Sequence, residues 1–346
     1  MRNDSPLVAC EALLLGRDRV TGVERYTSDI LCNSKGPYHL IMGPESPTSK
    51  VVREAALQRE WPVAQVTGNP MMAHQVGLGW YLRTRQPRLL GVHHFSLAPG
   101  VLSDGTPFSL TIHDVSAWRF PGTMSRGMRY LYRPLIERAL ASRLLRGIIT
   151  VSHFSLEEIV TVLKVPEERI AVVYAMLTYL SRTRPVALPQ VSEPFYLHVG
   201  TIEPRKNIEM LISAFRRAGL ADSVLYLVGR QGWQSLGALP HNVIHLSNVR
   251  DEHLAWLYKH AVALVSTSFY EGLGLPVAEA LSAGCRVFLI DIPIYREVYG
   301  GQTNSWLFRT ESQLCDLLRS PPAVSAATFT MPVAESLDGA MDRFYG

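Results

Sequence analysis

The sequence predicts an α/β protein with two domains, each a parallel sheet with helices packed against it. Two observations lead to this fold class. Short apolar runs alternate with segments of helical period in both halves of the chain, which is typical of doubly wound sheets. The length of 346 residues is also enough for about two domains of roughly 150 residues each.

A proline-rich stretch separates the two halves. Residues 185–194 contain three prolines and show neither a helical nor a strand period, as expected for a stiff linker. We therefore predict a first domain over residues 1–190 and a second over 191–325. In residues 326–346, apolar side chains recur at helical spacing and predict a helix.

The first half contains the strands and helices of one sheet. Apolar runs predict strands over residues 40–42, 89–92, 109–112 and 148–151. Apolar residues at helical spacing predict helices over residues 23–31, 51–59 and 128–144. Ser155 and Glu158 have the spacing of a capping box and predict one further helix start.

The second half is more regular. A strand over residues 195–199 ends at Gly200, and a helix over 207–217 follows, with its stop at Gly219. Further strands are predicted over residues 224–228, 243–246, 262–265 and 286–290, and further helices over 252–259 and 276–283. Because open parallel sheets bind ligands at the carboxyl ends of their strands, we expect the function to lie in the loops that follow strands.

The composition indicates a soluble, globular, cytoplasmic protein. Apolar residues make up 47% and charged residues 18% of the chain, which excludes disordered and coiled-coil classes. No apolar run approaches the roughly 18 residues of a membrane span, and no signal-peptide pattern is present. The four cysteines form no Cys-x-x-Cys pair, so we expect reduced thiols. His93 and His94 are adjacent on a predicted strand and face opposite ways, which argues against a metal ion shared between them.

Basic residues are concentrated in the first half. Residues 1–185 contain 22 Lys and Arg against 15 Asp and Glu, a net +7, while residues 186–346 contain 12 against 15, a net −3. The excess is densest between Arg119 and Arg146 and favours an anionic partner. Two interpretations stay open, a solvated helix face and an anionic membrane surface. Nucleic acid is not expected, because no nucleic-acid-reading motif accompanies these arginines.

The segment from Ser268 to Ala280 carries the strongest functional pattern. It runs from a predicted strand through a glycine-rich loop into a short helix, with Pro276 in the first turn. Free N–H groups of the loop and of that turn would form a cradle for an anion or a hydroxyl. Glu271 and Glu279 flank the loop, and carboxylates accept hydrogen bonds from the vicinal hydroxyls of sugars. Either residue alone could be a simple surface acid, but the combination indicates a sugar-nucleotide site.

This segment resembles the E-x7-E signature of the retaining glycosyltransferases of family 4. Four further segments are similar to motifs of that family: Gly22–Thr27, Thr111–Asp114, Ile149–Ser152 and Val199–Asn207. The matches spread over most of the chain. The resemblance implies the GT-B fold, in which two Rossmann-like domains face each other across a cleft. It also implies that the helix within residues 326–346 crosses back to the first domain.

The resemblance implies roles for matching residues of the second domain. Glu271 would bind hydroxyls of the transferred sugar, and Glu279 would bind the ribose of the nucleotide. Arg205 and Lys206 would neutralise the diphosphate as it leaves, since negative charge builds there when the bond breaks. The sugar and the diphosphate would also contact the N–H groups of Gly272, Leu273, Gly274 and Leu275.

Three more residues are implied to lie near the donor. His113 would face the donor sugar, Gly22 would let the backbone approach the substrate, and Thr201 stands where many relatives carry Arg. Glu24 occupies the position of a second glycine in the commoner form of that motif. Neither a metal ion nor another cofactor is implied, because Arg205 and Lys206 serve the leaving group and the chain has no Asp-x-Asp motif.

These inferences predict a retaining, metal-independent glycosyltransferase of polysaccharide biosynthesis, such as that of lipopolysaccharide or exopolysaccharide. The donor would be a nucleotide diphosphate sugar, with GDP-mannose or a related sugar favoured by the form of Glu203–Asn207. The acceptor would be a glycan or a polyprenyl-diphosphate-linked oligosaccharide, met at the inner face of the membrane. Two alternatives stay open: a sugar-nucleotide epimerase of the same fold, and a non-catalytic nucleotide-sugar-binding subunit.

Overall fold

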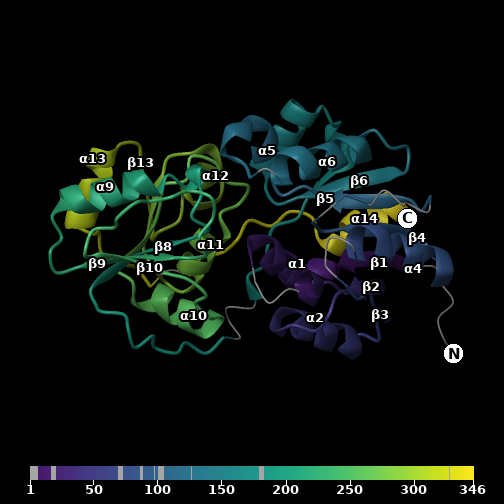
Figure 1. The fold of residues 1–346 in the computed structure, drawn as a ribbon, viewed down its shortest axis with the longest axis horizontal. Coiled ribbons are helices and arrows are strands. Elements are labelled where there is room, and N and C mark those ends of the chain that lie inside the picture. The colour runs from purple at the N-terminus through teal and green to yellow at the C-terminus, as the bar shows by residue number, and fades with distance from the viewer. Residues whose placement is uncertain are drawn as a thin grey trace. The chain divides into compact units, whose positions relative to one another are not determined.

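The computed structural model describes residues 7–16, 21–68, 73–85, 89–96, 98–99, 105–125, 127–178, 183–326 and 328–346. The chain divides into two compact units (Figure 1). The first consists of Met1–Met176 and Val333–Gly346, and the second consists of Leu177–Pro332. Each unit contains one parallel sheet with helices against it, which confirms the predicted α/β fold class.

The sheet of the first unit has seven strands in the order β3-β2-β1-β4-β5-β6-β7. Every neighbouring pair is parallel. β1 is buried along nearly its whole length, as expected for a central strand that is covered on both faces. The strands are β1 (Leu7–Ala12), β2 (Tyr38–Met42), β3 (Val63–Gln65), β4 (Leu89–His94), β5 (Phe108–Thr111), β6 (Leu145–Thr150) and β7 (Ile170–Val172).

Helices connect these strands, some of them through short 3-10 or π turns. The α-helices described in this unit are α1 (Gly22–Asn33), α2 (Pro47–Gln58), α4 (Leu78–Arg85), α5 (Ser116–Arg119), α6 (Arg133–Leu140), α7 (His153–Glu158) and α14 (Leu337–Tyr345). The turn η2 (Ala73–Gly77) leads into α4, and η4 (Met128–Tyr132) leads into α6. Within the described part of the chain, no helix has the length and apolar character needed to cross a membrane.

Two predicted helix boundaries are wrong. The helix predicted over residues 128–144 begins as the π turn η4, and α6 ends at Leu140 because the chain must turn before β6 starts. The predicted capping box at Ser155 is not formed, since α7 is capped by Ser152. The Ser152 hydroxyl oxygen accepts a hydrogen bond from the Ser155 N–H at 3.1 Å, and the Ser155 hydroxyl donates to the carbonyl of His113 at 3.2 Å.

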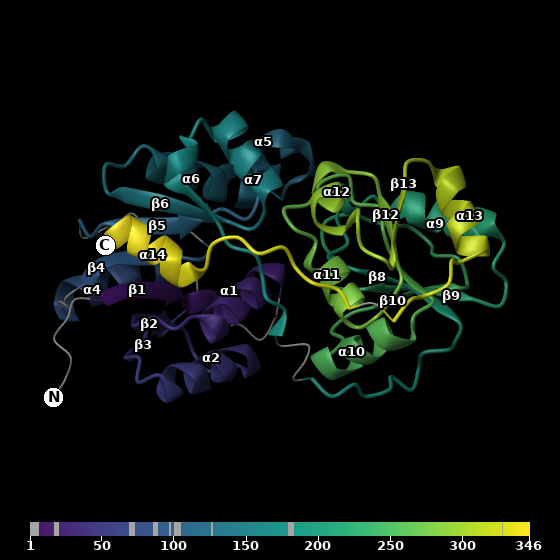
Figure 2. The same cartoon turned by 180° about the vertical axis from the view of Figure 1, so that it is seen from behind.

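The helix α14 belongs to the first unit, although it follows the whole second unit in the sequence. Figure 2 shows it in yellow, lying against the strands of this sheet. The Asp338 carboxylate accepts a hydrogen bond from the Tyr38 hydroxyl at 2.7 Å. A Cβ atom added to Gly147 of β6 would lie 2.2 Å from the ring of Phe344. Glycine at that position therefore lets the helix approach the sheet closely.

The sheet of the second unit has six parallel strands in the order β10-β9-β8-β11-β12-β13. They are β8 (Phe195–Val199), β9 (Val224–Val228), β10 (Val243–Leu246), β11 (Ala263–Ser266), β12 (Val287–Ile290) and β13 (Ser305–Phe308). The α-helices described here are α9 (Ile208–Ala218), α10 (Asp251–His260), α11 (Leu275–Ser282), α12 (Pro293–Tyr299) and α13 (Glu311–Arg319).

Successive side chains of β8 contact helices on opposite faces of this sheet. Phe195 stacks on Trp256 of α10 with ring centroids 6.1 Å apart, and Tyr196 meets Phe215 of α9 edge-on at 5.8 Å. Figure 1 shows the same layering, with α9 and α13 on one side of the strands and α10 on the other. β8 is thus held in the centre of the unit by both helical layers.

Candidate active site

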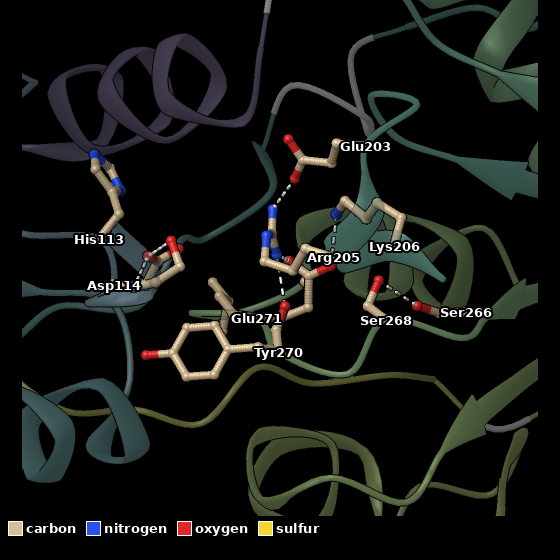
Figure 3. Close-up of polar contacts among 12 residues, drawn as sticks. His113, Asp114, Glu203, Arg205, Lys206, Ser266, Ser268, Tyr270 and Glu271 are labelled. Carbon is tan, nitrogen blue, oxygen red and sulfur yellow. Dashed lines mark hydrogen bonds and ion pairs between the residues drawn. The ribbon is translucent and has the colours of Figure 1, made fainter. Parts of the chain in front are cut away.

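In the second unit, the strand order reverses at β8. Its neighbours β9 and β11 continue to opposite edges of the sheet, which makes the ends of β8 and β11 the switch point where open α/β sheets bind ligands. The loop after β8 leads into the 3-10 turn η7 (Pro204–Lys206), and the loop after β11 holds the glycine-rich segment. Figure 3 shows that side chains of these two loops point toward one another.

Two cations and two carboxylates form a connected network at this switch point. Arg205 Nη1 lies 2.9 Å from Glu271 Oε2, and Arg205 Nη2 lies 2.6 Å from Glu203 Oε1. Lys206 Nζ lies 2.5 Å from the other oxygen of Glu271. Each of these side chains is at most 13% exposed. The structure therefore brings together three of the predicted catalytic residues, Arg205, Lys206 and Glu271.

The network keeps Glu271 ionised. Burial alone would raise the pKa of this carboxyl, but Arg205 and then Lys206 lower it, and the net result is a pKa of about 2. Pairing with two hydrogen-bonding cations offsets the cost of placing a carboxylate away from water. The opposite charges of the four groups balance, so the network is neutral before any ligand arrives.

The glycine-rich loop between Glu271 and α11 is fixed by aromatic side chains of α12. Gly274 has φ +80°, and a Cβ atom there would lie 2.9 Å from the ring of Tyr295. The Tyr299 hydroxyl donates hydrogen bonds to the carbonyls of Leu273 at 2.9 Å and of Gly274 at 3.3 Å. Pro276 has no N–H, and the Val277 N–H donates to the Gly274 carbonyl at 2.8 Å. In the first turn of α11, the Leu275 N–H is therefore the donor that the helix itself leaves without an acceptor.

Glu279 lies on α11 and points into the protein rather than into solvent. Its side chain is 1% exposed, and its Oε2 accepts a hydrogen bond from the Tyr258 hydroxyl of α10 at 2.5 Å. A free surface acid at a helix start would not be buried in this way. Thr201, the remaining predicted donor contact in this unit, lies partly exposed in the loop after β8.

His113 and Gly22 belong to the first unit, while the other predicted site residues belong to the second. His113 follows β5. Its Nε2 donates a hydrogen bond to the carbonyl oxygen of Phe95 at 3.1 Å. Burial lowers the pKa of His113, which favours the neutral imidazole. Gly22 is the first residue of α1, and Glu24 closes a capping box with Thr21. The capping box explains why a glutamate rather than a second glycine occupies position 24.

Comparison with known families agrees with this architecture. Residues 20–176 match the family model described as Glycosyltransferase Family 4, and residues 182–317 match the model described as Glycosyl transferases group 1. The chain belongs to the GT-B glycosyltransferases. The two models divide this glycosyltransferase close to the boundary between its two units, at Met176 and Leu177.

Individual relatives of this glycosyltransferase are similar over part of their length. It is 32% identical over 210 residues to O-antigen chain mannosyltransferase B of Escherichia coli, a match that covers 55% of this chain and 54% of that protein. It is 36% identical over 132 residues to the serotype-specific mannosyltransferase WbdA of Escherichia coli, covering 34% of this chain and 16% of that protein. The matched region is therefore about half or less of the length of these relatives.

A solved structure shares the fold over nearly the whole chain. The crystal structure of Anabaena Alr3699/HepE in complex with UDP and glucose superposes with a TM-score of 0.64 at 15% sequence identity. The alignment covers 91% of this chain and 90% of that chain. At this identity the similarity establishes the GT-B fold of the glycosyltransferase.

Sequence reasoning missed residues that support the site of this glycosyltransferase. Glu203 was not assigned a role, yet it holds Arg205. His198 lies on β8 beside Lys206, is 2% exposed, and places Nδ1 3.1 Å from the carbonyl of Val265. Burial, followed by the nearby charge of Lys206, lowers the pKa of His198 to about 4. The sequence does contain an indication of His198, because a histidine inside an apolar strand and directly before a functional loop is unusual.

Proposed function

We propose that this glycosyltransferase moves a sugar from a nucleotide diphosphate donor to a hydroxyl of a glycan or lipid-linked oligosaccharide, with retention of configuration at the anomeric carbon. The observation that carries the proposal is the buried pairing of Arg205 and Lys206 with Glu271, next to the N-terminal turn of α11. Fixed cations and helix N–H groups of this kind stabilise a departing phosphate group.

The charges in this network match the charges that develop during transfer. As the bond to the anomeric carbon breaks, negative charge builds on the diphosphate and positive charge builds on the sugar. Arg205 and Lys206 would stabilise the diphosphate, and Glu271 would accept hydrogen bonds from hydroxyls of the sugar. Because these cations and the start of α11 supply the positive charge that the leaving group needs, we propose that the step proceeds without a metal ion.

The ion pairs also suggest how buried charges stay compensated when the donor binds. Without the donor, Glu271 pairs with both cations. A donor carries a diphosphate, which can pair with the two cations, and hydroxyls, which can donate hydrogen bonds to the carboxylate. The cations could then turn toward the diphosphate while the carboxylate turns toward the hydroxyls, so no charge is left unpaired.

For the donor, we propose GDP-mannose. Two relatives named as mannosyltransferases, with 32% and 36% identity over the matched residues, support this choice. Thermal shifts with GDP, UDP and other nucleoside diphosphates test the base, because a ligand at about 100 times its Kd adds roughly 2.7 kcal/mol of stability. Greater stabilisation by UDP than by GDP would contradict GDP-mannose as the donor.

Activity measurements test the reaction itself. With GDP-mannose and a polyprenyl-diphosphate-linked oligosaccharide, we expect extension of the acceptor by one sugar, with the anomeric configuration of the donor seen in the product by NMR. Arg205→Ala and Lys206→Ala should each reduce transfer strongly. Arg217→Ala is the matched control, since it removes an exposed arginine that pairs with Glu311 at 3.0 Å. Full transfer by both site variants would overturn the proposed site.

The same assay separates the alternative functions. A sugar-nucleotide epimerase would convert or hydrolyse the donor without an acceptor. A nucleotide-sugar-binding subunit would show the thermal shift but no product in either condition. Only a transferase gives a product that depends on both substrates.

We further propose that the enzyme works in the cytoplasm, at the inner face of the membrane, through the basic segment around η4. In that segment, Arg133 pairs with Glu137 at 2.9 Å and Arg129 donates a hydrogen bond to the carbonyl of Pro121. Arg126, which belongs to the same basic segment, lies outside the described residues. The contact with Glu137 is the one expected if the arginines serve only a solvated helix face.

Co-sedimentation with vesicles decides between these two roles. Membrane binding predicts retention on anionic vesicles at low salt, release at high salt, and loss when Arg129 and Arg133 are both changed to Glu. Arg217→Glu with Arg250→Glu is the control for the change in net charge. Equal binding to anionic and neutral vesicles would contradict the membrane proposal. Binding that is retained after Arg129 and Arg133 are changed to Glu would contradict it as well.

A further inference from the structure

The interior of the first unit contains a cluster of one carboxylate and two imidazoles that the proposed transfer does not use. Glu11 lies near the carboxyl end of β1, His94 at the end of β4, and His74 in η2. Glu11 and His94 are register partners on adjacent strands, so their side chains project from the same face of the sheet. Their exposed fractions are 0% for Glu11, 1% for His74 and 3% for His94.

The three side chains converge on one point. Oε2 of Glu11 lies 3.5 Å from Nε2 of His74 and 3.8 Å from Nδ1 of His94. One ligand atom from each residue lies within 4.8 Å of the other two. Ligand atoms held at about 2.0 to 2.1 Å from a tetrahedral zinc ion are roughly 3.4 Å apart. Small side-chain rotations would therefore bring all three atoms into the coordination sphere of one ion.

One carboxylate oxygen of Glu11 faces the two histidines. Ala9, two residues earlier on the same face of β1, and Leu13, which follows the end of β1, are both buried apolar core residues. Oε1 accepts a hydrogen bond from the Leu13 N–H at 2.8 Å. Among the described residues, neither Oε2 of Glu11 nor Nδ1 of His94 has a hydrogen-bond partner. A buried carboxylate oxygen and a buried imidazole nitrogen that point at each other need a proton or a cation between them.

We propose that Glu11, His74 and His94 bind a zinc ion inside the first unit. Imidazole nitrogens and a carboxylate oxygen are ligands that zinc takes in proteins, and the hydrogen bond from Leu13 orients the carboxylate in the way that outer partners orient metal ligands. The ion would connect β1, β4 and η2. Its role would be to stabilise this unit, because the groups assigned to the leaving diphosphate belong to the second unit.

His93 provides a natural contrast on the same strand. It precedes His94 and points to the opposite face of the sheet, where its ring nitrogens lie 2.9 Å from the Ser109 hydroxyl and 3.0 Å from the Thr111 hydroxyl. Both nitrogens of His93 are thus satisfied by hydroxyl groups. The two adjacent histidines do not share an ion, and the partners of His94 come from β1 and η2.

Metal analysis of the full-length protein, purified without chelators, tests the site. We expect close to one zinc per chain, a lower Tm after removal of zinc by a chelator, and recovery of that Tm when ZnCl2 is added back. With a water molecule as the fourth ligand, replacement by Co²⁺ should produce the visible absorption bands of a four-coordinate site. These readouts do not depend on sugar transfer, so they can succeed or fail independently of the proposed function.

Variants assign the ligands. Glu11→Gln and His94→Gln should lose the zinc, while His93→Gln, a change of the same kind on the same strand, should retain it. If the ligand variants do not fold, chelation and back-titration of the wild-type protein still decide the question. A wild-type protein that binds no added zinc, or a folded Glu11→Gln variant with a full complement of zinc, would overturn the proposal. The cluster would then be a buried ion pair of Glu11 with a protonated histidine.

Discussion

Glu271 is the residue on which the proposed chemistry depends most, because it contacts both Arg205 and Lys206. Glu271→Gln keeps the shape of the side chain and removes its charge. We expect kcat to fall about a hundredfold or more, since loss of one preorganised electrostatic contact has effects of that size. Steady-state kinetics at saturating donor and acceptor measure it.

The control for this prediction is Glu311→Gln. It removes a carboxylate from an exposed pair with Arg217 at 3.0 Å, and we expect an unchanged kcat. If Glu271→Gln retained wild-type turnover while donor binding was saturated, the chemistry would have to be assigned to other residues.

The pKa of Glu271 predicts how stability depends on pH. Its folded-state pKa of about 2 lies below the ordinary value of 4.5, so the ionised form stabilises the folded state. That contribution, on the order of 3 kcal/mol, is complete above the unfolded pKa and is lost as the pH falls through the folded pKa. We therefore expect the unfolding free energies of wild type and Glu271→Gln to converge between about pH 4.5 and pH 2.

His198 acts in a different pH window and so does not obscure this result. Burial lowers its pKa from 6.5 to about 4, so the folded state loses stability as the pH falls through that range. His198 is present in both proteins, and its contribution cancels in the difference between them except for the part that Glu271 itself adds by raising the pKa of His198. Urea unfolding at a series of pH values gives the difference curve, and a constant difference below pH 4.5 would contradict the ion-pair explanation.

Among single residues, the charged residues of the functional motifs could be predicted from the sequence. Arg205, Lys206 and Glu271 stand out because their types and spacing fit a diphosphate and a sugar. Tyr258 could not be found in that way, since it acquires its role through packing between segments distant in the sequence. The Tyr258 hydroxyl, for example, reaches Glu279 from another helix.

The start of α11 is the element whose geometry matters most for donor binding. Gly274→Ala would place a Cβ atom 2.9 Å from the ring of Tyr295 at a backbone φ of +80°. We expect a loss of about 1 to 3 kcal/mol of stability and a clear weakening of nucleotide binding, because the loop must move to relieve both strains. Calorimetric titration with GDP and thermal unfolding measure the two effects.

Gly284→Ala separates backbone strain from displacement of the loop. Gly284 has φ +78°, but a Cβ atom there would meet nothing within 4 Å. We expect about 1 kcal/mol of destabilisation without any change in GDP affinity. Equal effects of the two substitutions on GDP affinity would show that the geometry of Gly274 has no special part in binding.

Most elements of the second unit could be predicted because buried strands and amphipathic helices alternate there without interruption. The strands β1, β3, β7 and β13 were not predicted, nor were the helices α12 and α13. In β1, Glu11 interrupts an otherwise apolar run, and only the surrounding fold shows that this carboxylate is buried beside two histidines. In β13, the run Ser305–Phe308 begins with a polar residue and contains neither valine nor isoleucine, so it lacks the β-branched pattern of the strands that were predicted. The helix cap at Ser152 was missed because Ser155 is followed three residues later by Glu158 and fits the capping-box pattern, whereas Ser152 is followed by another serine at that position.

At the scale of the whole molecule, α14 ties the two ends of the first unit together. Deletion of residues 333–346 would expose the surface around Gly147 that the Phe344 ring covers, and would remove the Asp338 partner of Tyr38. We expect a lower Tm and loss of transfer activity together, since large apolar groups stabilise a unit by burial. Thermal unfolding and the transfer assay on the shortened chain measure both.

Asp338→Asn is a milder form of the same experiment. It keeps α14 but weakens the acceptor that serves the Tyr38 hydroxyl and the N–H groups of Lys35 and Gly36. We expect an intermediate decrease in Tm. A shortened chain with the Tm and activity of the intact one would show that α14 is dispensable to the first unit.

Because the first unit is completed by a helix that follows the second unit in the sequence, the second unit is synthesised before the first is complete. Residues 177–332 leave the ribosome before α14 exists, so the second unit can form its sheet and its Arg205–Glu271 pair while the first is still missing a helix. The surface around Gly147 then stays uncovered for the time needed to translate more than 150 residues, which at about 5 to 20 residues per second is of order ten seconds or more. During that interval the nascent first unit lacks the side chains of Phe344 and Tyr345 that cover Gly147 and Gly91, and translation of α14 supplies them.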